Sequence, residues 1–341
     1  VMPGFALAQK VNEIYKKNPN INCLILLNHG IFTFDNDAKK SYDLMIKYVT
    51  IAEKTVRKLK RKKIKQIKKY STKFKPYEIA PILRGLLSEN KDQKFILNYR
   101  SNKTLDYFIN GKDVKRYSCI GTATPDHVIR VKPFPLIITP KQNSSIDDFK
   151  KLAEKSFKAY RKKYVRYFNT NKIKVKGKRT MLDTSPRVIL VQNVGLFSVG
   201  DSFNASKIAG DLTETNARVI SSVEETTKYK FISEKDLFDV EYWSLEQAKI
   251  KKAKKSLQGN IVVITGGFGA IGLETYKLFK SHGAEIVLLD YNSQKVKEVQ
   301  YKMKDLCLHC DVRNKNSVKN AFKKISDQYG GIDILISNAG T

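Results

Sequence analysis

Residues 261–290 read IVVITGGFGAIGLETYKLFKSHGAEIVLLD, and this stretch carries the most specific pattern in the chain. The apolar run at 261–264 has the length of a buried strand, and a helical pattern follows the glycine-rich turn. A second apolar run, which ends in Asp290, predicts a second strand. The order of strand, glycine turn, helix and strand predicts a parallel α/β sheet for the C-terminal part of the chain.

The glycine turn has the spacing Gly-x-Gly-x-x-Gly, at Gly267, Gly269 and Gly272. Glycine allows a tight turn and a close approach of the backbone to a pyrophosphate, and the next helix offers free N–H groups at its start. A carboxylate at Asp290, 18 residues beyond Gly272, accepts hydrogen bonds from an adenosine ribose and repels a 2′-phosphate. The sequence therefore predicts that this region binds NAD in preference to NADP.

The remaining elements of a half-sheet follow in order. A strand at CLHCDV (307–312) precedes a helix at 318–329, and a strand at 332–336 runs into Asn-Ala-Gly at 338–340. Together with TGGFGAIG and LLD, these segments resemble the short-chain dehydrogenase/reductase family over residues 257–341. One departure is Ala270, which stands where the glycine pattern of that family has Gly.

The resemblance implies a set of cofactor-binding residues: Thr265, Gly267, Phe268, Gly269, Ile271, Gly272, Asp290, Asp311, Val312, Asn338, Ala339 and Gly340. By this resemblance, Asp311 and Val312 flank the adenine, while the Asn-Ala-Gly segment lines the nicotinamide side and stabilises the sheet. The catalytic Ser and Tyr-x-x-x-Lys of the family come after that segment. We therefore expect them beyond Thr341 and assign no catalytic residue within this chain.

Residues 3–8 (PGFALA) and 26–32 (LLNHGIF) resemble the C-terminal part of the class II aldolase/adducin family. The resemblance implies that His29 is one of three histidines that hold a catalytic zinc ion, which acts as a Lewis acid on an enediolate. The other two histidines would precede Val1, so we expect an incomplete metal site here. From the residues alone, a single His beside a Gly is also interpretable as a turn or core residue.

A short repeat links this segment to the middle of the chain. Shifted by 165 residues, CLILLNHGIFTF (23–34) lies over VILVQNVGLFSV (188–199), with Val194 in place of His29. We therefore expect a second, degenerate aldolase-like module that serves as a scaffold or an interface. His127 is a weaker candidate for a substrate or metal contact, and Arg130 and Lys132 are weaker candidates for a phosphate contact.

Two further segments, TATPDHVIR (122–130) and FDVEYWSLEQAK (238–249), extend the resemblance over nearly the whole chain, to the bifunctional rhamnulose-phosphate aldolase/short-chain dehydrogenase family. It implies aldolase-like α/β/α modules at 1–75 and 76–250, followed at 251–341 by the N-terminal half of a doubly wound Rossmann parallel sheet. The implied activities are retro-aldol cleavage of a ketose 1-phosphate, such as rhamnulose 1-phosphate, and NAD-dependent oxidoreduction of the aldehyde product, such as lactaldehyde. The alternative is a single-activity NAD-dependent dehydrogenase whose aldolase-like part mediates assembly.

Composition restricts the other classes of function. In 341 residues no apolar run approaches the roughly 18–20 residues of a membrane span. The net charge of +31, densest in KTVRKLKRKKIKQIKKYSTKFK (54–75), raises nucleic acid as a partner, but no zinc-finger, RNP or helix-turn-helix pattern accompanies it. Four cysteines and no signal peptide indicate a reducing compartment. We expect a cytoplasmic homo-oligomer that acts on small sugar phosphates and aldehydes.

The remaining expectations concern secondary structure and the chain ends. The pattern predicts a helix from Asp37 to about Lys69, short strands within 94–139, helices at 146–167 and 205–223, and a helical linker at 244–256. Cys307 and Cys310 are expected to be buried rather than to bind a metal ion, because they lie on a strand and no partner cluster exists. The chain opens with Val1 and stops directly after a strand, so we expect it to come from a longer polypeptide.

Overall fold

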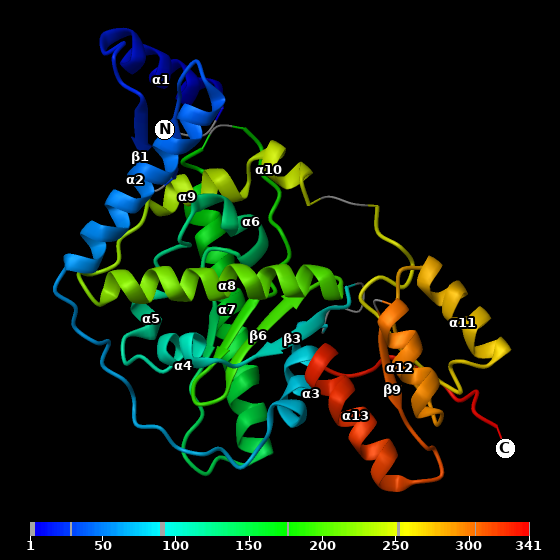
Figure 1. Ribbon diagram of the computed structural model, residues 1–341. Helices are drawn as coiled ribbons and strands as arrows, with labels where there is room; N and C mark the ends of the chain where they lie inside the picture. Colours follow the sequence, from blue (N-terminus) through cyan, green and yellow to red (C-terminus); the bar gives the residue numbers. More distant parts are fainter. Residues whose placement is uncertain are drawn as a thin grey trace.

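The structure is a computed structural model that describes residues 4–27, 29–88, 93–175, 177–250, 253–303 and 305–340. It consists of an N-terminal arm (residues 4–58), a middle unit (59–250) and a C-terminal unit (253–340), as Figure 1 shows. Both units contain a sheet with helices packed on its two faces, so the predicted α/β class is confirmed. Within the described ranges, no helix is both long and apolar enough to cross a membrane.

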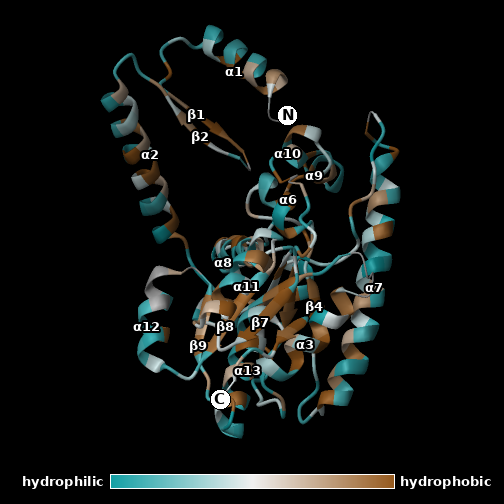
Figure 2. Cartoon of the chain, turned by 90° about the vertical axis from the view of Figure 1, so that its right-hand side faces the viewer, coloured by the Kyte–Doolittle hydropathy of each residue, from teal (hydrophilic) through white to brown (hydrophobic). Residues whose placement is uncertain are grey.

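The N-terminal arm projects from the middle unit, and its start returns to the neighbourhood of α10 (Figures 1 and 2), where a Cβ on Gly4 would lie 3.7 Å from the Trp243 ring. It comprises α1 (Phe5–Lys17), β1 (Cys23–Leu26), β2 (Gly30–Thr33) and α2 (Ala38–Lys58). The two strands pair as an antiparallel hairpin, and Asp37 caps α2 by accepting a hydrogen bond from Lys40 N. Among the described residues of these four elements none is buried, so the arm has no core of its own.

The helix predicted to reach Lys69 ends at Lys58, so this part of the prediction is wrong. Residues 59–75 run instead as a strap along the middle unit. Lys62 N donates a hydrogen bond to Glu225 O at 2.6 Å, and Ile67 N donates one to Asn110 O at 2.8 Å. Closely spaced lysines repel one another on a helix, whereas contacts with the middle unit hold the strap extended.

The middle unit is built on a four-stranded sheet of order β3-β6-β5-β4. Its strands are β3 (Ile96–Arg100), β4 (Leu136–Ile138), β5 (Val188–Val191) and β6 (Gly195–Gly200). β4 runs parallel to β5, and the other two pairs are antiparallel. Alternate residues of β5 enter opposite cores, since Ile189 and Val191 pack on one face while Val188 and Leu190 pack on the other.

Helices cover both faces of this sheet (Figure 1). In chain order the helices are α3 (Pro76–Leu87), α4 (Lys103–Ile109), α5 (Val114–Tyr117), the 3₁₀ turn η1 (Pro125–His127), α6 (Val128–Val131), α7 (Ile146–Lys172), α8 (Phe203–Glu224), α9 (Glu234–Glu241) and α10 (Ser244–Ala248). α3 and α7 contribute to one core, and α4 and α8 contribute to the other.

The predictions for this unit are confirmed for the long helices and wrong for several short elements. α7 and α8 contain the predicted helices at 146–167 and 205–223. Within 94–139 only β3 and β4 are strands, and most of the segment DYFIN (106–110), predicted as a strand, belongs to α4. Asn102 caps α4, and Leu105 and Ile109 are buried at helical spacing, so packing outweighs the strand preference of aromatic and branched residues. The linker expected to be helical over 244–256 is helical from Ser244 to Ala248 and not at 249–250 or 253–256, while residues 251–252 lie outside the described residues.

The C-terminal unit is a parallel sheet of order β10-β7-β8-β9. Its strands are β7 (Ile261–Thr265), β8 (Glu285–Asp290), β9 (Leu306–His309) and β10 (Ile334–Ile336), and its helices are α11 (Ala270–Ser281), α12 (Ser293–Lys302) and α13 (Lys315–Tyr329). The chain leaves β7 toward β8 on one side and returns as β10 on the other. A crevice outside the carboxyl ends of these strands is where doubly wound sheets bind ligands. Cys307 and Cys310 are buried as predicted.

The two units share a core and a buried ion pair. The Arg84 side chain on α3 donates to Phe95 O at 2.6 Å and to Gly259 O at 3.1 Å, and its Nη2 lies 2.5 Å from Oδ2 of Asp333. That carboxylate oxygen also accepts a hydrogen bond from Ile261 N, at the start of β7. Burial by itself raises the pKa of Asp333, but the hydrogen bond and charge of Arg84 outweigh it and lower the pKa below the usual value.

We predict that Arg84→Met destabilises the protein by about 3–5 kcal/mol, because it leaves Asp333 buried without its main counter-charge. The measurement is the free energy of unfolding from guanidinium titration. The matched control is Lys39→Met, which removes an exposed pair with Asp43 and is expected to cost less than about 1 kcal/mol. Equal losses in the two variants would contradict a special role for the buried pair.

Candidate functional site

The glycine turn connects β7 to α11 and is held by its own backbone. Gly267 N donates to Leu289 O and Gly269 N donates to Gly266 O, both at 3.1 Å. A Cβ on Gly272 would lie 2.5 Å from Gly266 O, so glycine at this position lets α11 begin against the turn. A Cβ on Gly269 would meet no protein atom closer than 3.4 Å, so packing does not require glycine there. Open space at this point is what a phosphate approaching the helix start needs.

The carboxylate of Asp290 lies against the same turn. Its Oδ2 accepts a hydrogen bond from Phe268 N at 3.2 Å, and its Oδ1 accepts one from Asn292 N at 3.1 Å. Asp290 is buried at the end of β8. The acid and the glycine turn are therefore adjacent in space, as binding of an adenosine ribose beside a pyrophosphate requires.

A pocket of about 310 Å³ opens at the carboxyl ends of the four strands. It is lined by residues that follow those ends: Gly266, Tyr291, Cys310, Asp311, Val312, Arg313, Ala339 and Gly340. The volume reaches the lower end of the range of about 300–1,000 Å³ that is typical of small-ligand pockets. Tyr291 and Arg313 are not among the residues predicted from the sequence, although they directly follow two that are, Asp290 and Val312.

Arg313 pairs with a neighbouring carboxylate in the wall of this pocket. Its Nη2 lies 3.0 Å from Oδ2 of Asp311, and its backbone N–H donates to the same carboxylate. The hydrogen bonds from Arg313 lower the pKa of Asp311 below the usual value. Asp311 is therefore ionised near neutral pH and presents a paired carboxylate to the pocket.

Thr265 and Asn338 hold two strand ends together. The Thr265 hydroxyl accepts hydrogen bonds from the N–H groups of Asn338 and Ala339, each at 3.0 Å. The Asn338 amide donates to Thr265 O at 3.0 Å and to Gly266 O at 3.2 Å. These contacts fix the end of β10 beside the glycine turn. Ile271, in contrast, is 73% exposed on the first turn of α11.

His29 lies in the exposed turn between β1 and β2, where its backbone N–H donates to Leu26 O at 3.0 Å. Across the described ranges, no three His, Cys, Asp or Glu side chains gather closely enough to hold a metal ion. The residues described here therefore do not fit a zinc centre by themselves. Asn28, the preceding residue, lies outside the described residues.

His127 ends η1 and contacts the neighbouring helix α8. Its Nδ1 lies 3.2 Å from Oδ1 of Asn216, which also accepts a hydrogen bond from Ala123 N at 2.9 Å. Because that oxygen is an acceptor, Nδ1 of His127 carries a proton in this contact. The contact ties the segment before α6 to α8.

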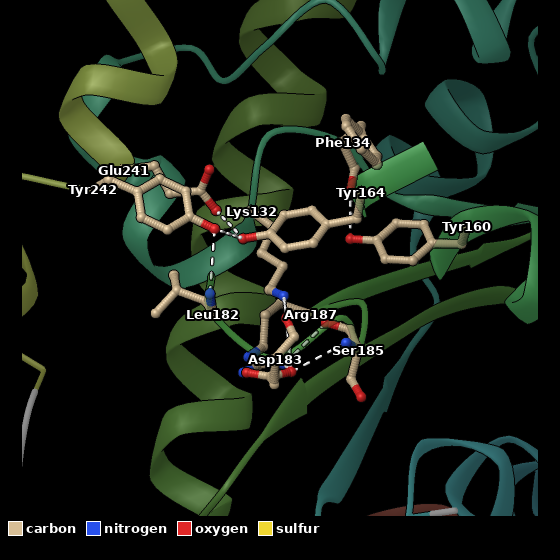
Figure 3. A network of polar contacts seen from close by, with 10 residues as sticks. All are labelled: Lys132, Phe134, Tyr160, Tyr164, Leu182, Asp183, Ser185, Arg187, Glu241 and Tyr242. Atoms are coloured by element: carbon tan, nitrogen blue, oxygen red, sulfur yellow. Dashed lines mark hydrogen bonds and ion pairs between the residues drawn. The ribbon is translucent and has the colours of Figure 1, made fainter. Parts of the chain in front are cut away.

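Lys132 is at the centre of a buried polar network, which Figure 3 shows. Its ammonium donates to Asp183 O, lies 3.7 Å from Oδ1 of Asp183, and sits 3.9 Å from the centre of the Tyr164 ring. Only 4% of Lys132 is exposed. The expectation that Lys132 reaches a phosphate is therefore wrong. Burial lowers the pKa of Lys132 to about 7.

Glu241 closes the other side of the network. The Tyr164 hydroxyl donates to Oε1 of Glu241 at 2.8 Å and lies 2.8 Å from the Tyr242 hydroxyl. Oε2 of Glu241 is buried and has no hydrogen-bond partner in the described part of the chain. Burial raises the pKa of Glu241 to about 7. The segments TATPDHVIR and FDVEYWSLEQAK, far apart in the sequence, meet in a separate small core, where Val128 of the first packs with Val240 of the second.

Comparison with known proteins divides the chain at the same place as the structure. A family model described as "Aldolase class II, second domain" matches residues 74–250, and one described as "short chain dehydrogenase" matches residues 260–341. An uncharacterized oxidoreductase, YuxG of Bacillus subtilis, is 28% identical over 363 residues, which cover all of this chain and 51% of that protein. The chain thus spans about half the length of this curated relative.

Two other similar proteins match about a quarter of the chain each. Short-chain dehydrogenase reductase 3b of Arabidopsis thaliana is 43% identical over 89 residues, which cover 25% of this chain and 35% of that protein. Among solved structures, the crystal structure of gox2181 covers 24% of this chain and 34% of its own, with 29% sequence identity and a TM-score of 0.22.

We predict that Glu241 makes stability depend on pH. Its pKa is raised in the folded state, so the folded protein keeps a proton that the unfolded chain releases between about pH 4.5 and pH 7. Stability from this group is therefore complete below the unfolded pKa and is lost as pH rises through about 7. The measurement is the decrease in the free energy of unfolding of each protein from pH 5 to pH 8. In the isosteric variant Glu241→Gln this decrease should be smaller by about 2 kcal/mol than in the unmodified protein. Parallel curves would contradict the prediction.

Proposed function

The chain belongs to the class II aldolase family, as its second domain, and continues into a short-chain dehydrogenase region; from this premise we propose that it forms part of a two-activity enzyme of sugar catabolism. One activity is retro-aldol cleavage of a ketose 1-phosphate, such as rhamnulose 1-phosphate. The other is NAD-dependent oxidoreduction of the aldehyde product, such as lactaldehyde.

One observation carries the dehydrogenase part of the proposal: the Asp290 carboxylate lies 3.2 Å from Phe268 N, within the glycine turn. A dinucleotide whose pyrophosphate rests at the start of α11 then has its adenosine ribose beside that carboxylate. A negative charge at this point favours the free 2′-hydroxyl of NAD over the 2′-phosphate of NADP. When bound, the nicotinamide supplies the hydride acceptor or donor, and the residues of this chain bind and orient it.

The fusion of the two regions supports a shared substrate. Retro-aldol cleavage of a ketose phosphate releases an aldehyde, which is the class of compound that a dehydrogenase oxidises or reduces. We assign residues 1–75 to the end of one aldolase-like module, 76–250 to a second and degenerate module, and 251–341 to the N-terminal half of a Rossmann domain. A cytoplasmic location and a homo-oligomeric state complete the proposal.

We predict that Asp290→Asn lowers the affinity of the intact protein for NAD about tenfold. It should also lower the ratio of the affinity for NAD to the affinity for NADP. The physical reason is the loss of charge-assisted hydrogen bonds to the ribose together with the loss of repulsion toward a 2′-phosphate. Calorimetric titration with NAD and with NADP measures both effects. Asp43→Asn, which changes the same charge on the N-terminal arm, is the control. The proposal fails if NADP binds the unmodified protein more tightly than NAD does.

A second candidate function is a single-activity dehydrogenase whose aldolase-like region only mediates assembly. His29 is exposed in the hairpin turn of an arm whose described residues include none that is buried, and this favours the alternative. In that case the buried network around Lys132 makes the middle unit a rigid scaffold.

Zinc content of the intact protein separates the two candidates. For the two-activity enzyme we predict one zinc ion per chain by elemental analysis, and its loss in His29→Ala. His282→Ala is the control, because His282 lies at the end of α11 and its Nδ1 contacts the Ser256 hydroxyl. Zinc that is absent from the unmodified protein, or that survives in His29→Ala, would support the single-activity candidate.

A further inference from the structure

The N-terminal arm repeats part of the middle unit in three dimensions. When 165 is added to their first residue numbers, β1, β2 and α2 begin where β5, β6 and α8 begin. The pairing register is also the same, because Cys23 pairs with Thr33 as Val188 pairs with Ser198. The sequence repeat therefore corresponds to a structural repeat of a β-hairpin followed by a helix.

The turn and the helix cap are repeated as well. His29 N donates to Leu26 O at 3.0 Å, and the matching bond of the middle unit joins Val194 N to Val191 O at 3.1 Å. Each helix is capped by the side chain of the residue before it, which accepts a hydrogen bond from a backbone N–H three residues further on. The middle unit can thus serve as a template for what the arm contacts.

The two hairpins differ in what pairs with them. In the middle unit, β6 pairs antiparallel with β3, and β5 pairs parallel with β4. In the part of the chain that the structure describes, β1 and β2 pair only with each other. Their outer edges therefore carry unpaired backbone groups, and an isolated two-stranded hairpin is at best marginally stable in water.

Both faces of the arm hairpin also lack part of their cover. Ile25 is 70% exposed and Phe32 is 50% exposed, whereas Leu190 and Phe197 at the matching positions are fully buried. Those two residues belong to the cores on opposite faces of the middle sheet. Figure 2 shows apolar residues along both strands of the arm. Exposed apolar surface beside unpaired strand edges is typical of a protein interaction site.

The charges on α8 and α2 show that the missing neighbour differs from β3. In the middle unit, Arg100 of β3 pairs with Asp211 at 2.6 Å and with Glu214 at 3.1 Å. The matching residues of α2 are Ile46 and Val49, which offer no carboxylate. A guanidinium placed there would be desolvated without a counter-charge, which is strongly unfavourable. β3 of a second copy of this chain therefore does not fit the arm.

The shape of the helices gives the same result. A Cβ on Gly210 of α8 would lie 2.6 Å from the Arg100 side chain, so glycine makes room for that arginine. α2 has Met45 at the matching position. The strand that lies beside β2 therefore carries a short apolar residue where β3 has Arg100.

The order of the chain indicates where this strand comes from. Both strands that complete the middle sheet, β3 and β4, precede the hairpin in the sequence. A repeat keeps the order of its elements, so the matching strands of the arm precede α1. The relative from Bacillus subtilis also has about half of its length outside the region that matches this chain.

We propose that the arm is a docking surface for a preceding segment of the same polypeptide, which supplies an apolar strand antiparallel to β2 and a second strand parallel to β1. The turn that carries His29 then lies on a four-stranded sheet instead of an isolated hairpin. This proposal rests on the assignment of residues 1–75 to the end of one module, and it names what completes that module.

The experiment is hydrogen exchange followed by mass spectrometry. It compares this chain of 341 residues with the longer polypeptide that includes the residues before Val1. We expect the amides of β1 and β2 to exchange about a hundredfold more slowly in the longer polypeptide, because pairing and burial protect them there. The amides of β5 and β6 should exchange equally in both.

Two variants test the docking face. In the longer polypeptide, Ile25→Asp should lower the protection of β1 and β2 at least tenfold, because it places a charge in the new core. Lys39→Asp, on the exposed side of α2, should leave the protection unchanged. In the chain of 341 residues, Ile25→Asp should leave the midpoint of thermal unfolding unchanged, since Ile25 is exposed there.

NAD affinity, measured in parallel, separates this proposal from the proposed function. It should be the same in Ile25→Asp and in the unmodified protein, because Asp290 lies in the C-terminal unit. Loss of NAD binding in both proteins would therefore count against the dehydrogenase assignment and not against the docking surface.

Three results would overturn the proposal. The first is equal exchange of β1 and β2 in the two polypeptides. The second is equal protection in Ile25→Asp and Lys39→Asp. The third is protection in the chain of 341 residues together with a dimer mass that Ile25→Asp abolishes, which would assign the face to a second copy. A structure of the longer polypeptide with a strand parallel to β2 would overturn the predicted direction of pairing.

Discussion

The arrangement of the two α/β units depends on one buried cation. The Arg84 side chain extends from α3, and its guanidinium donates hydrogen bonds to acceptors in the segments that precede β3, β7 and β10. A buried charge is tolerated only where its donors are matched, because an unmatched charge in the protein interior costs several kcal/mol. Asp333 supplies the match and also accepts a hydrogen bond from Ile261 N. The contact that joins the units therefore also fixes the start of the strand that leads into the glycine turn.

The two ends of the parallel strands in the C-terminal unit differ chemically. The carboxyl ends carry the glycine turn, Asp290 and a pocket lined by residues that follow the strands. The amino ends meet the middle unit, where Glu285 and Asp333 accept hydrogen bonds from Phe203 and Arg84. Because all four strands run in the same direction, contact with the middle unit at their amino ends leaves the pocket at their carboxyl ends open.

Prediction from sequence worked where the signal was local. The strand, turn, helix and strand at 261–290 lie where the pattern indicates, because apolar runs, glycine spacing and helix period all act within a few turns of chain. The strand prediction for DYFIN is wrong because the cap at Asn102 and the burial of Leu105 and Ile109 outweigh the strand-like composition of the segment. The helix after Asp37 stops early because its basic continuation pairs with Glu225 and Asn110, which lie far along the chain.

The order of elements, the α/β class and the pairing of a glycine turn with an acid at the next strand end are all encoded by residues that lie near one another in the chain, so they are readable without a structure. The surroundings of the Arg130 and Lys132 side chains cannot be predicted in this way. These cations are two positions apart, yet one lines a pocket while the other is buried beneath Tyr164 and against Asp183. Burial of Lys132 depends on how segments about fifty and a hundred residues away fold back on it, and no local pattern carries that information.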